Sequence, residues 1–376
     1  MNLAPLQKQI QTNCDISDAR HAGLYSLCGL LLRLRDLYKW EHALLPWQEP
    51  DPAVLLEWVE TRETHWETVA QHEFQALTVD NQSFDPFDVA TINLRLRPLG
   101  VIYGAGYVMG MKPSFFLGEV TASRTLGDLQ IDVIGRELAR DIYTTPAMRQ
   151  GPQIFARTSA MLFFLWDQIL ELRPSTREAL VFALRHYGLE AEALRQQPAR
   201  LASALHHVAA RELEAWIYHE VGEVHEQAFD GQVWHEIVAT YANSLVEIFA
   251  RVTKDLLADT HPEGLLAHII RHRRHSTLGF YVAFMRPFTR AVFPEITEAF
   301  RQFRLAEQWA VIDEARSNGY AKAASFARQL VEIHEKGSGK PPEWAIAEIQ
   351  ERLITPLGIP GTALERADTK EQPDER

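Results

Sequence analysis

The near-continuous helical pattern that begins at Gly135 constrains the fold more than any other feature of this sequence. From there on, apolar residues recur at helical spacing, and only short turn-forming segments interrupt them. The N-terminal third also predicts two helices, one capped by Asp15 or Ser17 and a second over residues 53–74. Amphipathic helices bury their apolar faces against one another. We therefore expect a mainly α fold with a large, helical bundle-like body.

Residues 80–135 interrupt this pattern. Glycine and proline are frequent there, and the runs 114–121 and 129–134 flank the turn sequence ASRTLGD. These runs predict a small β-hairpin element near residues 100–135. Gly104, Gly106 and Gly110 approach a dinucleotide-binding fingerprint, but the third glycine comes one residue late and no βαβ unit surrounds it. We expect these glycines to permit tight turns and close backbone packing.

Five segments make up the expected organisation of the chain. They are N-terminal helices over residues 1–80, the Gly-rich and β-hairpin element over 81–135, a helical body over 136–335, a linker with a short helix over 336–355, and a disordered tail over 356–376. The sequence KGSGKPP marks the linker, and the tail is rich in glycine, proline and charge.

Charge and composition exclude several classes of partner. The formal net charge is −12 and the sequence pI is about 5.7, so neither nucleic acid nor an anionic membrane is an expected partner. No apolar run approaches the ~18–20 residues of a membrane span. Cys14 and Cys28 would lie about 21 Å apart on a single helix, too far for a disulfide. We expect a cytoplasmic protein.

The densest cluster of candidate ligands is RELEAWIYHEVGEVHE, residues 211–226. On a helix, one stripe carries Glu and His side chains that could bind a metal ion, namely Glu212, His219, Glu223 and Glu226. The other interpretation of this stripe is a solvated helix face. Glu220 lies among apolar residues, so its charge requires a partner or a raised pKa. It is either a catalytic acid or base, a support for the metal ligands, or one half of an ion pair with arginine.

A second cluster is HIIRHRRHS, in which His268, His272 and His275 follow the i, i+4, i+7 spacing of one helix face. His268 and His272 have a common two-ligand spacing and are candidate metal ligands. Three neighbouring arginines suit an anion site as much as a metal. An exposed basic helix is the plainer alternative. A further hypothesis places this cluster opposite the acidic stripe, across a cleft.

Two other segments combine charge with apolar residues. In LRLRDLYKWE, Arg33 and Arg35 either belong to a structural ion-pair network or bind an anionic cofactor or organic ligand. In GRELARD, residues 135–141, the i, i+4 charge pairs predict a salt-bridged helix start. Glu137 and Asp141 could alternatively share a metal ion with Glu119.

The segments LRLRDLYKWE, FDPFD, YGAGY and GRELARD resemble those of an uncharacterised bacterial family of hypothetical proteins. The resemblance covers most of the chain. That family carries no assigned activity, so the resemblance implies no catalytic residues.

The leading functional hypothesis is a Glu/His metal site in a helical protein, with iron or manganese as the metal and a non-haem oxidoreductase as the class of enzyme. Helical bundles build such sites from Glu and His on facing helices. One alternative is a non-enzymatic binding or scaffold protein that forms a homo-oligomer or a partner complex. A third is a small-anion or organic-ligand pocket lined by Arg33, Arg35 and residues 268–275.

Overall fold

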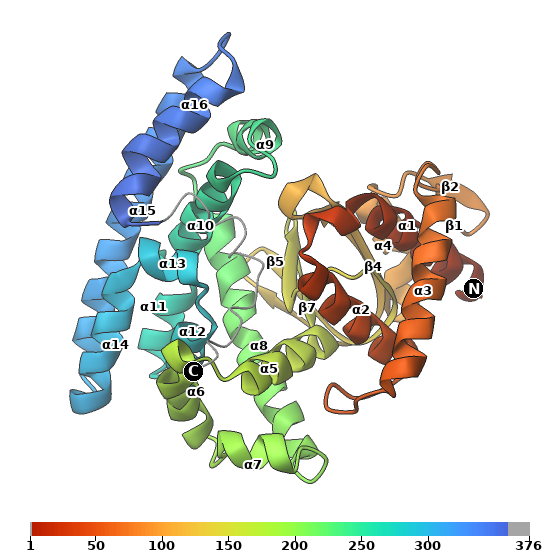
Figure 1. Cartoon of the computed structure of the whole chain (residues 1–376), viewed down its shortest axis with the longest axis horizontal. Coiled ribbons are helices and arrows are strands. Elements are labelled where there is room, and N and C mark those ends of the chain that lie inside the picture. Colours follow the sequence, from red (N-terminus) through yellow and green to blue (C-terminus); the bar gives the residue numbers. More distant parts are fainter. Residues whose placement is uncertain (1, 360–376) are drawn as a thin grey trace. The chain divides into compact units, whose positions relative to one another are not determined.

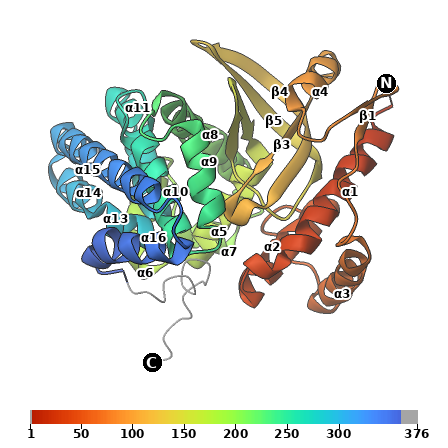
Figure 2. The same ribbon diagram turned by 90° about the horizontal axis from the view of Figure 1, so that it is seen from above.

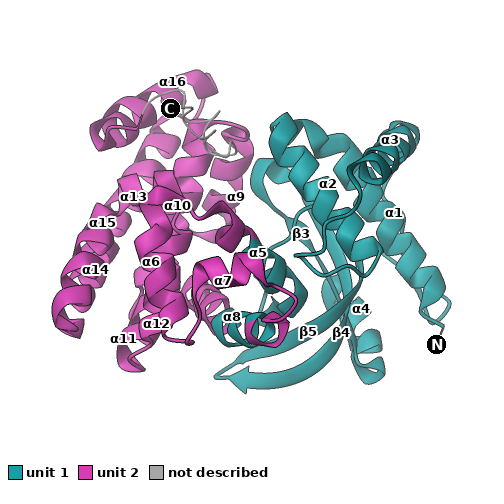
Figure 3. Cartoon of the chain, turned by 60° about the horizontal axis from the view of Figure 1, so that its bottom comes forward, with its two compact units in different colours: residues 1–166, 205–213 teal, residues 167–204, 214–376 magenta. Residues whose placement is uncertain are grey.

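A computed structural model describes residues 2–359. The chain forms two compact units, which are coloured separately in Figure 3. Unit 1 contains residues 1–166 and 205–213, and unit 2 contains residues 167–204 and 214–376. The boundaries between the units fall within two helices, α5 (Thr158–Glu171) and α8 (Ala202–His225).

Unit 1 combines helices with two β-sheets. Its helices are α1 (Ala4–His21), α2 (Leu27–Glu41), α3 (Pro52–Val69) and α4 (Val89–Leu96). Its strands are β1 (Leu77–Val79), β2 (Gln82–Phe84), β3 (Val101–Tyr107), β4 (Pro113–Leu126), β5 (Leu129–Arg140), β6 (Ala147–Gln150) and β7 (Gln153–Arg157).

The expectation of a mainly α fold with only a small hairpin is wrong. Strands β3 to β7 form a five-stranded sheet in the order β3-β4-β5-β7-β6. The sheet is mixed, because β5 pairs with β7 in parallel while the other neighbours are antiparallel. It is strongly curled, as Figures 1 and 2 show. The hairpin expected near residues 100–135 is confirmed as β4 and β5, but it is the centre of this larger sheet.

The segment GRELARD shows why the sheet was missed. It was expected to start a helix, but residues 135–140 continue β5. Glu137 and Arg140 are buried, and Glu137 forms ion pairs with Arg140 and with Arg157 of β7. Charges that suggest a solvated helix face therefore lie inside unit 1, where ion pairing compensates part of their lost hydration.

Helix α1 packs against β4 and β5. Its apolar face contributes Leu6, Ile10 and Cys14 to the core of the sheet. The expected cap residues Asp15 and Ser17 are buried inside this helix rather than at its start. The Ser17 hydroxyl donates to the Pro113 carbonyl, and so it ties the helix to the first residue of β4.

The two cysteines lie on different helices, contrary to the single helix assumed from the sequence. Cys14 is buried in α1, Cys28 is exposed in α2, and both are free thiols. Helix α2 begins after Ser26, whose side chain accepts a hydrogen bond from the Gly29 amide. This Ser26 cap therefore starts a separate helix within the segment that the sequence suggested was continuous.

Close packing against a neighbouring side chain explains Gly104 of β3, whereas a Cβ atom at Gly106 would make only an ordinary contact. A Cβ atom at Gly104 would lie only 2.0 Å from Cε1 of Phe116 in the neighbouring strand. Gly110 has a positive φ of 67° in the turn between β3 and β4. Glycine is therefore required at position 104 by contact and at position 110 by backbone conformation.

Unit 2 is helical in its described part. Its helices besides α8 are α6 (Pro174–Arg185), α7 (Ala191–Gln196), α9 (Gly231–Thr240), α10 (Leu245–Thr260), α11 (Leu265–Arg271), α12 (His275–Phe284), α13 (Pro287–Val292), α14 (Pro294–Ala306), α15 (Trp309–Lys336) and α16 (Pro342–Ile349). Helix α15 packs against α10, α11 and α14. No described helix is both long and apolar enough to cross a membrane. Most of the expected tail, residues 360–376, lies outside the described residues.

A buried lysine joins α1 to the sheet of unit 1. The Lys112 ammonium lies 3.0 Å from a carboxylate oxygen of Asp18 and 3.0 Å from one of Asp141. All three side chains are almost completely buried. Burial raises the pKa of Asp18, the charge of Lys112 lowers it and that of Asp141 raises it, with a net value of about 7. This pKa is higher than the pKa of Asp18 in the unfolded chain. The contribution of Asp18 to the free energy of unfolding is therefore lowest above pH 7.

We predict that Lys112→Met destabilises the protein by about 3–5 kcal/mol at pH 8, because two buried carboxylates lose their counter-charge. The loss should be smaller at pH 5, where the raised pKa of Asp18 lets this carboxyl become neutral. Urea unfolding at both pH values measures the difference. The control is Lys336→Met, which removes a surface ion pair with Glu332 and should cost under about 1 kcal/mol. A loss for Lys112→Met that is equal at pH 5 and pH 8 contradicts the argument.

Candidate metal centre

Helices α8 and α10 meet at a glycine. A Cβ atom at Gly222 of α8 would lie 2.1 Å from the backbone carbonyl oxygen of Ala258 in α10. No side chain fits in this space, so the two backbones touch. His219 and Glu223 precede and follow Gly222 on α8, and Asp255 and Asp259 flank Ala258 on α10 at the same helical spacing. The contact therefore brings four polar side chains together within unit 2.

The imidazole of His219 lies at the centre of this cluster. Its Nδ1 is 2.8 Å from Oδ1 of Asp259, and its Nε2 is 4.0 Å from Oε1 of Glu223 and 4.0 Å from Oδ1 of Asp255. A carboxylate at Nδ1 favours the tautomer in which Nδ1 carries the proton. In the neutral ring, the lone pair of Nε2 then lies on the side of Glu223 and Asp255.

Electrostatics favour the protonated form of His219. Burial lowers its pKa, but the charge and hydrogen bond of Asp259, with the charges of Asp255 and Glu220, raise it to about 10. Loss of hydration raises the pKa of Asp255, the charge of His219 lowers it and that of Glu223 raises it. The Asp255 side chain is still 52% exposed, so water screens part of these effects.

A lysine also neutralises the cluster. The Lys254 ammonium lies 2.6 Å from Oε1 of Glu223 and 5.3 Å from the ring centroid of Trp234. With His219 protonated, two positive charges face the carboxylates of Glu223, Asp255 and Asp259. The cluster is therefore an acidic site whose charge is already largely compensated.

Among the described residues, three side chains satisfy the spacing of a metal site. One ligand atom each from His219, Glu223 and Asp255 lies within 4.8 Å of the other two. The sequence predicted His219 and Glu223 as a pair, and the structure brings them together. The sequence pattern did not single out Asp255 or Asp259. The only signal for them is two aspartates one helical turn apart in KDLLADT.

The other predicted ligands of the acidic stripe lie elsewhere. Glu212 is buried two turns earlier in α8, about 10 Å from His219 along the helix axis. Glu226 ends α8, where its carboxylate accepts a hydrogen bond of 2.6 Å from the Ala228 amide. Glu220 is 8% exposed, and its charge contributes to the raised pKa of His219.

The histidines of HIIRHRRHS do not share one helix face. Helix α11 ends at Arg271, and His275 begins α12. His268 is buried and stacks on Tyr218, with ring centroids 3.6 Å apart. His272 caps the end of α11, 4.5 Å from His268. Helix α11 therefore contacts α8 through Tyr218, the residue before His219.

Arg33 and Arg35 lie in α2 of unit 1. The Arg33 guanidinium lies over the ring of Tyr25, 4.5 Å from its centroid, and the Arg35 guanidinium lies 3.0 Å from a carboxylate oxygen of Asp36. The three carboxylates considered together as metal ligands, Glu119, Glu137 and Asp141, are separated from one another by their own ion pairs. Glu119 pairs with Arg136, Glu137 with Arg140 and Arg157, and Asp141 with Lys112.

The fold and this cluster define a protein with an α/β unit and a helical unit whose helices present a His/carboxylate site. Two family models match the chain. One, Family of unknown function (DUF6866) N-terminal domain, matches residues 5–157, and the corresponding C-terminal domain matches residues 162–353. The chain belongs to this family. The border between the matches falls where β7 ends and α5 begins. No curated protein and no solved structure matches the chain.

We predict that Gly222→Ala forces α8 and α10 apart, at a cost of about 1–3 kcal/mol. Because His219 then moves away from Asp259, the pKa of His219 should fall from about 10 toward its ordinary value. Urea unfolding measures the first effect, and NMR titration of the imidazole measures the second. Gly231→Ala is the matched control, because no atom lies within 4 Å of the added Cβ. Equal behaviour of the two variants would contradict the role of the contact.

Proposed function

We propose that His219, Glu223 and Asp255 bind a divalent metal ion. The observation that carries the proposal is the orientation of His219. Its Nδ1 contacts Asp259 at 2.8 Å, while its Nε2 lies 4.0 Å from both candidate carboxylates. Metal-binding histidines commonly use their second nitrogen in this way, because a carboxylate at that nitrogen fixes the ring and makes it a better ligand.

The distances suit an ion after a small adjustment. An ion about 2.1 Å from two ligand atoms holds those atoms about 3.0–3.4 Å apart. The two 4.0 Å separations therefore need to shorten by up to about 1 Å, and the oxygens of Glu223 and Asp255, which lie within 4.8 Å of each other, by up to about 1.8 Å. Lys254 must leave Glu223 at the same time, and the ion would replace both its charge and the proton on His219.

The donor set favours iron or manganese. One imidazole with two carboxylates suits Fe(II) and Mn(II), and no cysteine lies among the three donors. Three protein ligands leave coordination positions open for water or substrate, which is the arrangement of reactive metal sites. We therefore extend the proposal to a metal-dependent enzyme, and specifically to a non-haem oxidoreductase. The bound ion would supply the redox chemistry, while Asp259 orients its histidine ligand.

The first test is metal content. Protein purified without a His tag or chelator should contain close to one equivalent of iron, manganese or zinc, and the double variant His219→Ala/Glu223→Ala should lose it. Adding the metal to depleted wild-type protein at pH 8 should raise Tm, because ions that bind only the folded state stabilise it. Asp313→Asn is the control, since this aspartate is 53% exposed, like Asp255, but lies outside the cluster. The proposal is contradicted if the wild-type protein is purified without metal and its Tm does not change when Fe(II), Mn(II) or Zn(II) is added.

A second test addresses the orienting carboxylate. We expect Asp259→Asn to weaken Mn(II) binding about 10- to 100-fold, as the loss of such a supporting group typically does. Asp255→Asn removes a ligand atom and should weaken binding more. Isothermal titration calorimetry at pH 8 measures both. If Asp259→Asn binds Mn(II) as tightly as the wild type does, His219 is not oriented by Asp259 in the metal complex.

A further inference from the structure

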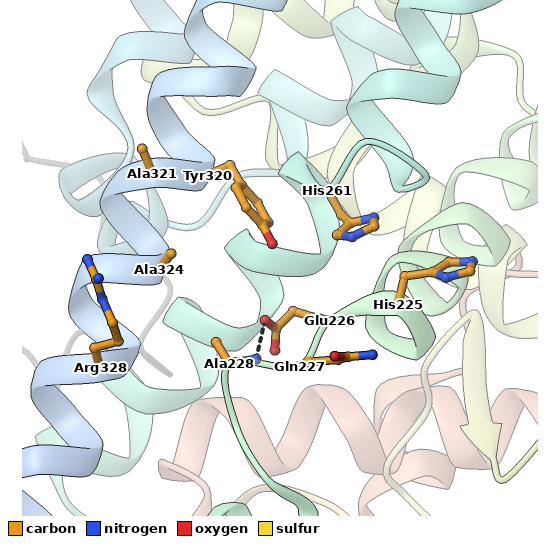
Figure 4. Close-up of a pocket in the computed structure, with 9 residues that line it drawn as sticks. All are labelled: His225, Glu226, Gln227, Ala228, His261, Tyr320, Ala321, Ala324 and Arg328. Carbon is orange, nitrogen blue, oxygen red and sulfur yellow. Dashed lines mark hydrogen bonds between the residues drawn. The ribbon is translucent and has the colours of Figure 1, made fainter.

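Unit 2 contains a pocket that is separate from the proposed metal ligands. It has a volume of about 700 Å³, within the range of small-molecule sites. Its lining comes from residues 225–228 at the end of α8, from His261 after α10, and from one face of α15. Figure 4 shows Tyr320, His261 and Glu226 around its centre, with Arg328 farther along α15. Ala321 and Ala324 contribute only small side chains on that helix.

Glu226 supplies an anchored negative charge. One oxygen of its carboxylate accepts a hydrogen bond of 2.6 Å from the Ala228 amide, which fixes the side chain at the end of α8. Its second oxygen remains available to a ligand. In Figure 4 the hydroxyl of Tyr320 extends toward this carboxylate. Burial raises the pKa of Tyr320 and the charge of Glu226 raises it further, so the phenol stays a neutral hydrogen-bond donor.

Arg328 supplies the opposite charge. Within residues 2–359 its guanidinium forms no ion pair or hydrogen bond, and in particular none with Glu226. Arg328 lies two turns from Tyr320 on α15, about 12 Å along the helix axis. The pocket therefore presents a carboxylate and a guanidinium that do not neutralise each other.

Rings and a further donor complete the lining. The rings of His225 and His261 are nearly parallel, with centroids 5.6 Å apart, and Tyr320 meets His261 edge-on at 5.8 Å. Nδ1 of His261 accepts a hydrogen bond of 3.1 Å from the Glu263 amide, so the neutral ring carries its proton on Nε2. Aromatic faces next to a carboxylate favour an ammonium group.

We propose that this pocket binds a small amino-carboxylate zwitterion, an amino acid or a short peptide. Its ammonium group lies at Glu226 among the aromatic rings, and its carboxylate is bound by the guanidinium of Arg328. A guanidinium binds a carboxylate through two parallel hydrogen bonds, which gives geometric selectivity over simple anions. The proposal is independent of the metal centre, because none of the residues that line the pocket is a proposed metal ligand.

The test is a thermal-shift screen of the full chain with the twenty L-amino acids and a set of dipeptides, followed by calorimetry on the compounds that raise Tm. We expect at least one zwitterion to bind with a Kd below about 1 mM. Acetate and methylamine, which each carry one of the two charges, should bind at least tenfold more weakly. If no zwitterion in the panel raises Tm, or if methylamine or acetate alone binds as tightly, the proposal is overturned.

Variants locate the site. Glu226→Gln retains an oxygen for the Ala228 amide but loses the charge, and Arg328→Met removes the guanidinium from an exposed position. Each should weaken zwitterion binding at least tenfold, whereas Glu298→Gln and Arg301→Met, from an exposed ion pair on α14, should leave it unchanged. His219→Ala should lose metal and keep the zwitterion, which separates failure of this proposal from failure of the metal site. Wild-type affinity in both pocket variants would overturn the assignment.

Discussion

Buried or partly buried charge that must find a partner is the constraint on which both units depend. In unit 1, Lys112 lies between Asp18 and Asp141, and Glu137 lies between two arginines. In unit 2, His219 lies against Asp259. Removing a charge from water costs several kcal/mol, and only close, hydrogen-bonded partners offset this cost. Each pair therefore ties its own elements together: α1 to the sheet, β5 to β7, and α8 to α10.

This constraint also explains what the sequence could not reveal about the fold. The runs 114–121 and 129–134 and the turn sequence between them were enough to predict the β4–β5 hairpin. The charges of GRELARD occur at i, i+4 spacing, which is usual for a solvated helix, and they were interpreted in that way. Their true partners include Arg157, twenty residues later. Spacing along the chain describes local neighbours only, so a strand that buries ion pairs looks like a helix surface.

The candidate metal centre was also predictable only in part. One helical turn separates His219 from Glu223, so their proximity follows from α-helix geometry alone. Asp255 and Asp259 reach them only because α8 and α10 touch at Gly222, and no pattern within either helix contains that contact. Glu212 and Glu226 were included because they share the same stripe. However, a stripe of seven-residue steps extends about 10 Å per step along the axis, which is far longer than the reach of one ion.

If the proposed ion binds, the same cluster has two physically distinct states. Without metal, the two positive charges of protonated His219 and Lys254 compensate most of the charge of three carboxylates. Because the pKa of His219 is about 10, removing its proton at pH 7 costs on the order of 4 kcal/mol. A divalent ion that binds here has to exceed this cost and the loss of the Lys254–Glu223 pair. Metal binding is then an exchange of a proton and an ammonium group for one ion. The ion pairs thus link α8 to α10 without any ion, and they hold the proposed ligands close to one another.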